Sequence, residues 1–206
     1  MNINGVECES AEYYDVKVKA DPYIYNSECG KIRNQIFLEF IKDIRFEFVI
    51  ELAAGTGVFA EAFLTERPNL REYVHTDFSE IANELAAKNL SKFSQVKIMK
   101  LDVYNGDDLK ILSRYESYPG QLVVCSSLEH FPAGIDLHIF SKIPSCVHIL
   151  VCGSTFPITV SNSHCHVFKD EKYMLDRYTI ENKLLTNVKI KTICDGAVVA
   201  MYGIKI

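Results

Sequence analysis

The sequence lacks any apolar run of roughly 18 residues, and its first residues lack a basic segment followed by an apolar one. A membrane span needs the first feature and a secretory leader needs the second. We therefore expect a cytoplasmic protein with no membrane partner. The sequence also lacks internal repeats and low-complexity tracts, and its 206 residues suffice for one domain with a sizeable core.

Positive charge is in deficit. The chain has 22 Lys and Arg against 27 Asp and Glu, which gives a formal net charge of −5 and a pI near 5.7. Proteins that bind nucleic acid usually present a basic surface. The balance therefore disfavours an RNA or DNA substrate, although a local basic groove would still allow one. Apolar residues make up 48% and charged residues 24%, which argues against long disordered segments.

The seven cysteines contain no C-x-x-C pair, and their odd number indicates neither a disulfide framework nor a zinc cluster. We expect most of them to be reduced, with Cys125 and Cys152 packed as small apolar side chains inside buried runs. His164-Cys165-His166 offers two histidines at H-x-H spacing, but without supporting carboxylate spacing we do not assign it a metal.

The stretch from Phe48 to Ala60 has the pattern of a buried strand, a tight glycine turn and a helix start. Gly55 and Gly57 allow positive φ and close approach of a ligand to the main chain, and the first N–H groups of the helix face the same space. Glu51 near the strand end suits a ligand with amines or hydroxyls and would repel a phosphate there. This stretch therefore predicts a ligand cradle.

Strand and helix patterns alternate beyond this turn and predict an α/β fold with one doubly wound, mostly parallel sheet. The chain closes with two strand-like runs joined at Asp195-Gly196, a strong hairpin signal that implies an antiparallel edge. Expected strands are 72–77, 96–101, 121–126, 146–152, 187–194 and 197–206, and expected helices are 31–42, 58–66, 79–90, 107–115, 135–142 and 169–178.

The first 30 residues carry several tyrosines among charges and are interpreted as a short arm with one helical turn. Aromatic side chains on such an arm can cover a cleft or pack on the domain surface, and Tyr14 is our candidate for a ligand contact. We divide the chain into an N-terminal arm and helix covering the cleft, residues 1–45, and a ligand-binding domain, residues 46–206, which together form one structural unit.

Acidic residues follow three successive strands, where an open parallel sheet binds its ligand. Asp77 is placed to accept hydrogen bonds from both ribose hydroxyls, with Phe78 against an adenine face. Asp102, with the Val103 backbone, is placed to accept from an adenine amino group. Each acid alone also fits a helix cap or a turn, but three strand-end acids around a glycine turn favour a nucleoside site.

These segments together resemble the class I S-adenosylmethionine-dependent methyltransferases. The resemblance rests on Val49–Gly57, His75–Ser79, Lys100–Val103 and Ser127–Phe131. It implies a Rossmann-like, seven-stranded sheet whose last strand is antiparallel, and a bound S-adenosyl-L-methionine that leaves as S-adenosyl-L-homocysteine. Family members usually have glycine where this chain has Ala53. The candidate cofactor contacts are Tyr14, Glu51, Ala53, Gly55, Gly57, Asp77, Phe78, Asp102, Val103, Ser126 and Ser127.

Methyl transfer to an O–H or N–H group requires removal of a proton, for which a histidine or carboxylate at the cleft is suited. The candidate catalytic residues are Glu129, His130, His164 and His166. The segment 126–130 resembles the E-x-x-E-H segment of metal-assisted methyltransferases, but Ser126 replaces the first glutamate. One carboxylate and one histidine are too few for a Mg²⁺ or Zn²⁺ site, so we predict no metal.

The predicted activity is methylation of a hydroxyl or amine on a small molecule, either a metabolite or a sugar-like compound. Gly55-Thr56-Gly57-Val58-Phe59-Ala60 also fits G-x-G-x-x-A with an acid about 20 residues on, so an NAD-dependent oxidoreductase is the alternative. A non-catalytic cofactor-binding protein is a third hypothesis. The chain lacks an Asn/Asp-Pro-Pro-Tyr segment after the fourth strand, which disfavours DNA base methylation. RNA and protein acceptors and the oligomeric state stay open.

Overall fold

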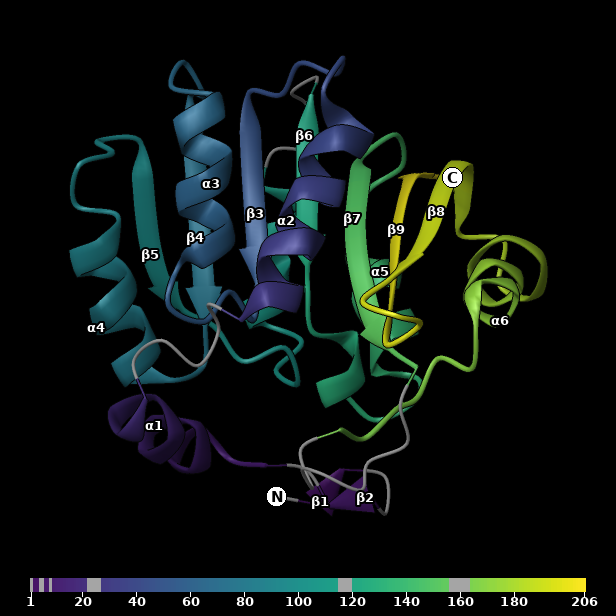
Figure 1. Cartoon of the computed structure of the whole chain (residues 1–206), viewed down its shortest axis with the longest axis horizontal. Coiled ribbons are helices and arrows are strands. Elements are labelled where there is room, and N and C mark those ends of the chain that lie inside the picture. The colour runs from purple at the N-terminus through teal and green to yellow at the C-terminus, as the bar shows by residue number, and fades with distance from the viewer. Residues whose placement is uncertain (1, 4–5, 8, 22–26, 115–119, 156–163) are drawn as a thin grey trace.

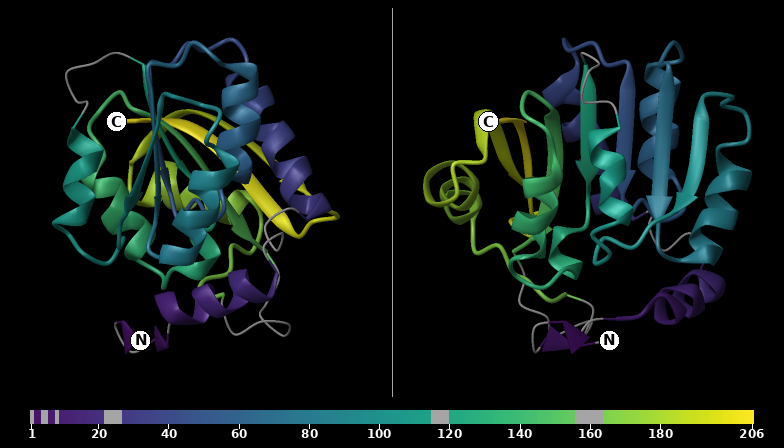
Figure 2. Two further views of the ribbon diagram at one scale, coloured as in Figure 1. Left: turned by 90° about the vertical axis from the view of Figure 1, so that its left-hand side faces the viewer. Right: turned by 180° about the vertical axis from the view of Figure 1, so that it is seen from behind.

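A seven-stranded sheet between two layers of helices dominates the fold (Figures 1 and 2). This computed structural model describes residues 2–3, 6–7, 9–21, 27–114, 120–155 and 164–206. The strand order is β5-β4-β3-β6-β7-β9-β8. The strands are β3 (Phe48–Leu52), β4 (Glu72–Asp77), β5 (Val96–Lys100), β6 (Gln121–Cys125), β7 (His148–Ser154), β8 (Leu185–Ile193) and β9 (Val198–Lys205).

Strands β3 to β7 pair in parallel, whereas β9 runs antiparallel to both β7 and β8. The predicted doubly wound sheet with an antiparallel C-terminal hairpin is therefore confirmed. The last strand β9 does not form the edge, because it inserts between β7 and β8. Burial explains this order: β9 is mostly buried, while β8 exposes alternate residues such as Thr186, Lys189 and Lys191 and suits the edge position.

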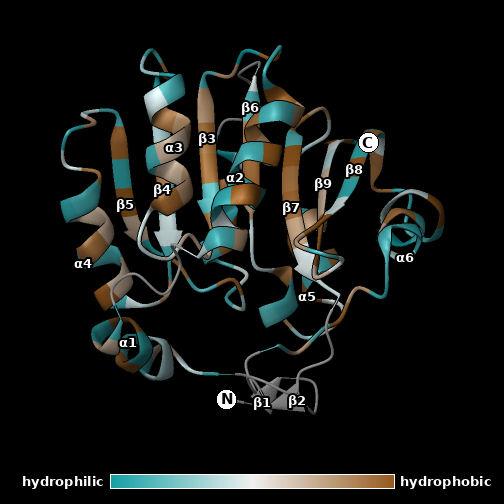
Figure 3. Cartoon of the chain, viewed as in Figure 1, coloured by the Kyte–Doolittle hydropathy of each residue, from teal (hydrophilic) through white to brown (hydrophobic). Residues whose placement is uncertain are grey.

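The central strands are apolar on both faces, as expected for a parallel sheet covered by helices. All five residues of β3 and all five of β6 are buried, and Figure 3 shows apolar residues concentrated on β3, β6 and β7. On one face, Val49 packs with Phe37 and Phe63 from the helices α2 and α3. On the other face, Ile50 belongs to a core that includes Phe140 of α5.

Helices α2 (Glu28–Ile41), α3 (Val58–Glu66) and α4 (Glu80–Asn89) cover one face of the sheet, and α5 (Ile135–Lys142) covers the other (Figure 2). Ser79 caps α4, because its hydroxyl accepts the Ala82 N–H at 3.0 Å. The predicted helix 107–115 is a short 3-10 helix, η1 (Asp108–Ser113). A second one, η2, spans Leu128–His130, and α6 (Glu171–Asp176) continues into a π-helical turn at Arg177–Glu181.

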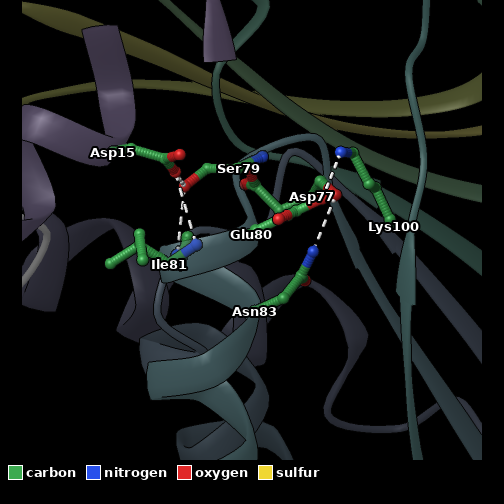
Figure 4. A network of polar contacts seen from close by, with 8 residues as sticks. Asp15, Asp77, Ser79, Glu80, Ile81, Asn83 and Lys100 are labelled. Atoms are coloured by element: carbon green, nitrogen blue, oxygen red, sulfur yellow. Dashed lines mark hydrogen bonds and ion pairs between the residues drawn. The ribbon is translucent and has the colours of Figure 1, made fainter. Parts of the chain in front are cut away.

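The N-terminal segment is more helical than the sequence indicated. Helix α1 spans Ala11–Ala20, and the short strands β1 (Asn2–Ile3) and β2 (Val6–Glu7) precede it. The carboxylate of Asp15 accepts hydrogen bonds from the Ser79 hydroxyl at 2.5 Å and the Ile81 N–H at 3.3 Å (Figure 4). Helix α1 is thereby docked at the start of α4, below the carboxyl ends of the parallel strands (Figure 1).

Cys29 of α2 and Cys194, which follows β8, form a disulfide with Cα atoms 5.8 Å apart. The cysteine spacing gave no sign of this pair, because the two residues are 165 positions apart and meet only where α2 packs on the β8–β9 hairpin. Cys125, Cys146, Cys152 and Cys165 are free thiols, so the expectation that most cysteines are reduced holds for the described residues. Within the described chain, each helix is too short or too polar to cross a membrane.

Candidate functional site

A cavity of about 260 Å³ opens at the carboxyl ends of the parallel strands. Its wall is built from the glycine turn after β3, the ends of β4 and β6, and parts of α1 and α2. Sequence-predicted residues that line it are Tyr14, Glu51, Ala53, Gly55, Asp77, Phe78, Val103, Ser126, Ser127, Glu129 and His130. Four others, Gly57, Asp102, His164 and His166, are not among its lining residues.

The glycine turn adopts the backbone that its sequence requires. Ala53, Gly55 and Gly57 have φ values of 48°, 60° and 85°, all in the left-handed region. Ala53 therefore holds a conformation that glycine adopts more easily, which accounts for the glycine usual at this position in the resembling family. A Cβ on Gly57 would lie 2.9 Å from Leu90 Cδ1, so Gly57 serves the packing of α3 against the end of α4.

Glu51 is buried in the fourth position of β3 and lines the cavity. The hydroxyl of Tyr73 donates a 2.6 Å hydrogen bond to Glu51 Oε2. Burial raises the pKa of Glu51 to about 7, against the opposing effects of this hydrogen bond and of the nearby Arg33. A positively charged ligand group beside Glu51 would therefore stabilise its ionised form.

Asp77 connects the end of β4 to the glycine turn. Its Oδ2 accepts the Gly55 N–H at 2.8 Å and its Oδ1 accepts the Ser79 N–H at 2.9 Å. Burial raises the pKa of Asp77 to about 6, although these backbone hydrogen bonds oppose the rise. Phe78 beside it contacts the Tyr14 ring, with ring centroids 5.4 Å apart. The predicted ribose and adenine contacts Asp77 and Phe78 thus lie side by side at the cavity, with Tyr14 of α1 over them.

Asp102 has a different local role from Asp77. Its Oδ1 accepts the Tyr104 N–H at 2.9 Å, and its own N–H donates to Asp108 Oδ2 at 2.9 Å. These bonds form the turn between β5 and η1. Val103 and Tyr104, rather than the Asp102 carboxylate, contribute to the cavity wall, so the adenine contact of Asp102 stays a prediction.

Arg33 of α2 lines the cavity, but from the sequence it was assigned only to an expected helix over residues 31–42 and not to the ligand site. Its guanidinium donates to Asn34 Oδ1 at 2.9 and 3.1 Å and lies 3.5 Å from the Ser126 carbonyl oxygen. Ser127 in turn donates to the Ala53 carbonyl oxygen at 3.3 Å. The sequence signal that could have identified Arg33 is a positively charged residue in the first turns of an amphipathic helix, just after Cys29-Gly30.

Two loops bring three of the four candidate catalytic residues together. The rings of His130 and His164 have centroids 5.0 Å apart, and His130 Nε2 lies 3.9 Å from Glu129 Oε1. The backbone carbonyl of Glu129 accepts the N–H groups of Cys165 and His166 at 2.7 and 3.1 Å, which fixes one loop against the other. Each of Glu129, His130 and His164 offers one donor atom, and these three atoms lie within 4.8 Å of one another.

His166 is separate from this group. Its ring packs on Phe168 with centroids 4.3 Å apart, and it is 7% exposed. Tyr173 lies on the other side, with its hydroxyl 3.4 Å from Nε2. The structure therefore places His166 in the core between the sheet and α6, away from the cavity wall that it was predicted to join.

No protein-family model and no curated protein matches the chain. Among solved structures, the carbon methyltransferase CurJ aligns at a TM-score of 0.69 with 13% identity, covering 93% of this chain and 59% of that chain. An O-methyltransferase family protein from Burkholderia thailandensis aligns at 0.65 with 14% identity, covering 95% and 63%. The DhpI–SAH complex aligns at 0.66 with 14% identity, covering 95% of both chains.

This chain spans about three fifths of the length of the first two of these structures. At such low identity the likeness establishes the fold. Together with the strand order β5-β4-β3-β6-β7-β9-β8, it shows that the chain has the Rossmann-like fold of the class I S-adenosylmethionine-dependent methyltransferases.

Proposed function

We propose that this protein is an S-adenosylmethionine-dependent methyltransferase that methylates a hydroxyl or amine of a small, metabolite-like or sugar-like molecule. Glu51 is the observation that carries the proposal. It is a fully buried carboxyl at the cavity wall, and its hydrogen-bond partner is a tyrosine hydroxyl rather than a cation. Burying such a group is costly unless a positive charge joins it. A ligand ammonium group in the cavity supplies that charge.

The remaining cavity residues fit the other parts of such a ligand. Arg33 is placed to bind the carboxylate of an amino-acid tail whose ammonium pairs with Glu51. Asp77 has oxygen lone pairs left to accept ribose hydroxyls, in addition to its two backbone hydrogen bonds. Phe78 and Tyr14 offer aromatic surface to an adenine. When bound, S-adenosylmethionine supplies an electrophilic methyl group on a positively charged sulfur.

Glu129, His130 and His164 are the groups proposed to act on the methyl acceptor. Glu129 and His130 line the same cavity as Glu51, and His164 adjoins them from the second loop. Burial, followed by the proximity of His130, lowers the pKa of His164 below its usual value. A neutral imidazole can accept a proton from an acceptor hydroxyl or amine and can orient it by hydrogen bonding.

The size of the acceptor follows from what covers the cavity. Tyr14 of α1 contacts both Phe78 and His130, with ring centroids 5.4 and 5.9 Å apart, and therefore roofs the space between the proposed adenosine and acceptor sites. A roofed cavity favours a small acceptor over a polymer. The net charge of −5 supports this assignment, because it provides little attraction for nucleic acid.

Isothermal titration of the full chain with S-adenosylhomocysteine tests the proposal. We expect a single saturable site, and a parallel titration with NAD⁺ should give no heat of binding. The absence of S-adenosylhomocysteine binding at millimolar concentration would overturn the proposal. Binding of NAD⁺ in its place would instead support the oxidoreductase alternative suggested by the G-x-G-x-x-A pattern.

A further inference from the structure

Glu129, His130 and His164 form a donor set that the sequence did not predict as a unit. Glu129 and His130 belong to η2 after β6, whereas His164 comes from the segment that leads to α6, more than 30 residues further along the chain. We propose that these three side chains bind a late first-row divalent cation, represented by Zn²⁺ or Co²⁺, beside the proposed methyl-acceptor site. The role in methyl transfer, though not the binding itself, rests on the proposed function.

The spacing of the donor atoms suits a single ion. In a site with metal–ligand bonds of about 2.0–2.2 Å, neighbouring donor atoms lie roughly 3–3.5 Å apart. His130 Nε2 and Glu129 Oε1 are separated by 3.9 Å, and the whole set lies within 4.8 Å. Rotation of the two imidazole side chains is the movement that the proposed site requires. The backbone positions are already fixed by the Glu129 carbonyl, which accepts two N–H groups from the His164 loop.

Glu129 supplies a second, independent observation. Its Oε2 atom is buried and has no hydrogen-bond partner among the described residues, and its side chain is only 14% exposed. A buried carboxylate oxygen without a partner costs free energy, so native structures normally satisfy it. A cation held between this carboxylate and the two imidazoles satisfies it.

The choice of metal follows from the ligand types. Two imidazoles and one carboxylate suit Zn²⁺, Co²⁺, Ni²⁺ or Fe²⁺, whereas Mg²⁺ prefers oxygen ligands only. Three protein ligands leave at least one coordination position open toward the cavity that Glu129 and His130 line.

An open position beside the cavity gives the ion a chemical role. A divalent cation lowers the pKa of an oxygen that binds to it, in the way that Zn²⁺ brings the pKa of bound water to about 7. An acceptor hydroxyl at that position gives its proton to solvent, and its lone pair forms the new bond to the methyl carbon. The electron pair of the broken carbon–sulfur bond stays on sulfur, which leaves as a neutral thioether. The ion therefore favours hydroxyl acceptors over amines.

Calorimetric titration of the EDTA-treated full chain with Zn²⁺ tests the site. We expect one site of micromolar affinity or tighter, and Mg²⁺ should bind at least 100-fold more weakly. His164→Asn and Glu129→Gln should each weaken Zn²⁺ binding by at least tenfold. His138→Asn is the matched control, because this exposed histidine of α5 lies outside the set, and Cys165→Ser controls for the neighbouring thiol. Both controls should bind Zn²⁺ as the wild type does.

The outcomes separate this proposal from the proposed function. Each variant is also titrated with S-adenosylhomocysteine, and retained binding shows that it is folded. Unchanged Zn²⁺ affinity in folded His164→Asn, or loss of affinity in Cys165→Ser, would overturn the metal site while leaving the cofactor site standing. Zn²⁺ binding without S-adenosylhomocysteine binding would overturn the proposed function and support the metal site. If His164→Asn does not fold, Co²⁺ absorption spectra of the wild type decide, since thiolate charge-transfer bands would contradict nitrogen and oxygen ligands.

Discussion

The hydroxyl of Tyr73 donates a 2.6 Å hydrogen bond to the carboxyl of Glu51, and both side chains are buried beneath the glycine turn. The two strands β3 and β4 that carry them are neighbours in parallel register, with Val49 opposite Tyr73. Burial nevertheless dominates and raises the pKa of Glu51 to about 7. The free protein therefore holds a carboxyl that is half-protonated near neutral pH and ready to pair with a cation.

Glu51 should reduce the stability of the free protein at high pH. Because its pKa is higher in the folded state than in the unfolded state, its contribution is fully present below about pH 4 and is lost as the pH rises through about 7. Glu51→Gln should therefore raise the free energy of unfolding at pH 8 by about 1–3 kcal/mol and change it little at pH 5. Urea denaturation at the two pH values measures this.

Glu61→Gln is the control for that measurement, since Glu61 lies on the surface of α3 and pairs with Lys92. Its effect should stay below about 0.5 kcal/mol at both pH values. An equal change for Glu51→Gln at pH 5 and pH 8 would show that Glu51 does not titrate in this range.

Removing the Asp77 carboxylate should weaken cofactor binding. Asp77→Ala deletes the acceptor for the Gly55 and Ser79 N–H groups and the proposed ribose contact. We expect S-adenosylhomocysteine affinity to fall by roughly 1.5–3 kcal/mol, the range for hydrogen bonds to charged groups. Asp107→Ala, at an exposed position just before η1, should leave the affinity unchanged. A dissociation constant that does not respond to Asp77→Ala would remove the ribose assignment.

The disulfide between Cys29 and Cys194 should stabilise the fold. It joins residues 165 positions apart and ties α2 to the β8–β9 hairpin. A crosslink across a long loop typically contributes about 2–4 kcal/mol by restricting the unfolded chain. Cys29→Ser should lower the free energy of unfolding by about that amount under oxidising conditions, whereas Cys146→Ser, an exposed free thiol, should not. Equal stability of the wild type with and without dithiothreitol would indicate that the bond does not form.

Among these substitutions, removal of the Asp136 charge should lower the free energy of unfolding most. It is fully buried at the start of α5 and accepts hydrogen bonds from Arg177 at 2.7 and 2.8 Å and from Tyr178 at 2.6 Å. Burial tends to raise its pKa, but the hydrogen bonds from Arg177 and Tyr178 together hold the pKa below the usual value. Asp136→Asn should destabilise by roughly 3–5 kcal/mol, because Arg177 keeps a poorly compensated charge.

Two comparisons check the role of Asp136. Asp176→Asn, which removes the half-buried partner of the exposed Lys172, should cost less than about 1 kcal/mol. The contribution of Asp136 should be present at neutral pH and should be lost as the pH falls through its lowered pKa, so the two variants should converge in stability toward pH 3. A gap between them that stays constant from pH 7 to pH 3 would contradict an ionic role.

The strongest features of the fold could be predicted from local pattern. Helix α3 has the predicted bounds, because the glycine turn precedes it and Pro68 follows it. Strand β4 has the predicted bounds, because it is a short apolar run. Both signals are local and do not depend on the rest of the chain. Helix α1 was predicted as a single turn. Its contact with the domain, through the hydrogen bond from Ser79 to Asp15, is a tertiary contact that the local pattern does not show. The insertion of β9 inside the sheet depends in the same way on long-range packing.

The cavity residues also divide into those that local pattern predicts and those that depend on tertiary contacts. Glu51, Asp77 and Phe78 could be identified because each follows or ends an apolar strand, and the sheet edge brings such residues together. Arg33 and the meeting of His164 with Glu129 could not, since they depend on how α2 and a distant loop fold over that edge. His166, two residues from His164, points into the core because Phe168 packs against it. Proximity in sequence did not distinguish the two histidines.

The most direct test of the cofactor assignment is the affinity for S-adenosylhomocysteine as a function of pH. Glu51 must be ionised to pair with the ligand ammonium, and its pKa in the free protein is about 7. The dissociation constant of the wild type should therefore be roughly tenfold lower at pH 8 than at pH 6. Glu51→Gln should bind more weakly at pH 8 and lose most of this pH dependence. Binding that is independent of pH in the wild type, or as tight in Glu51→Gln, would contradict the account.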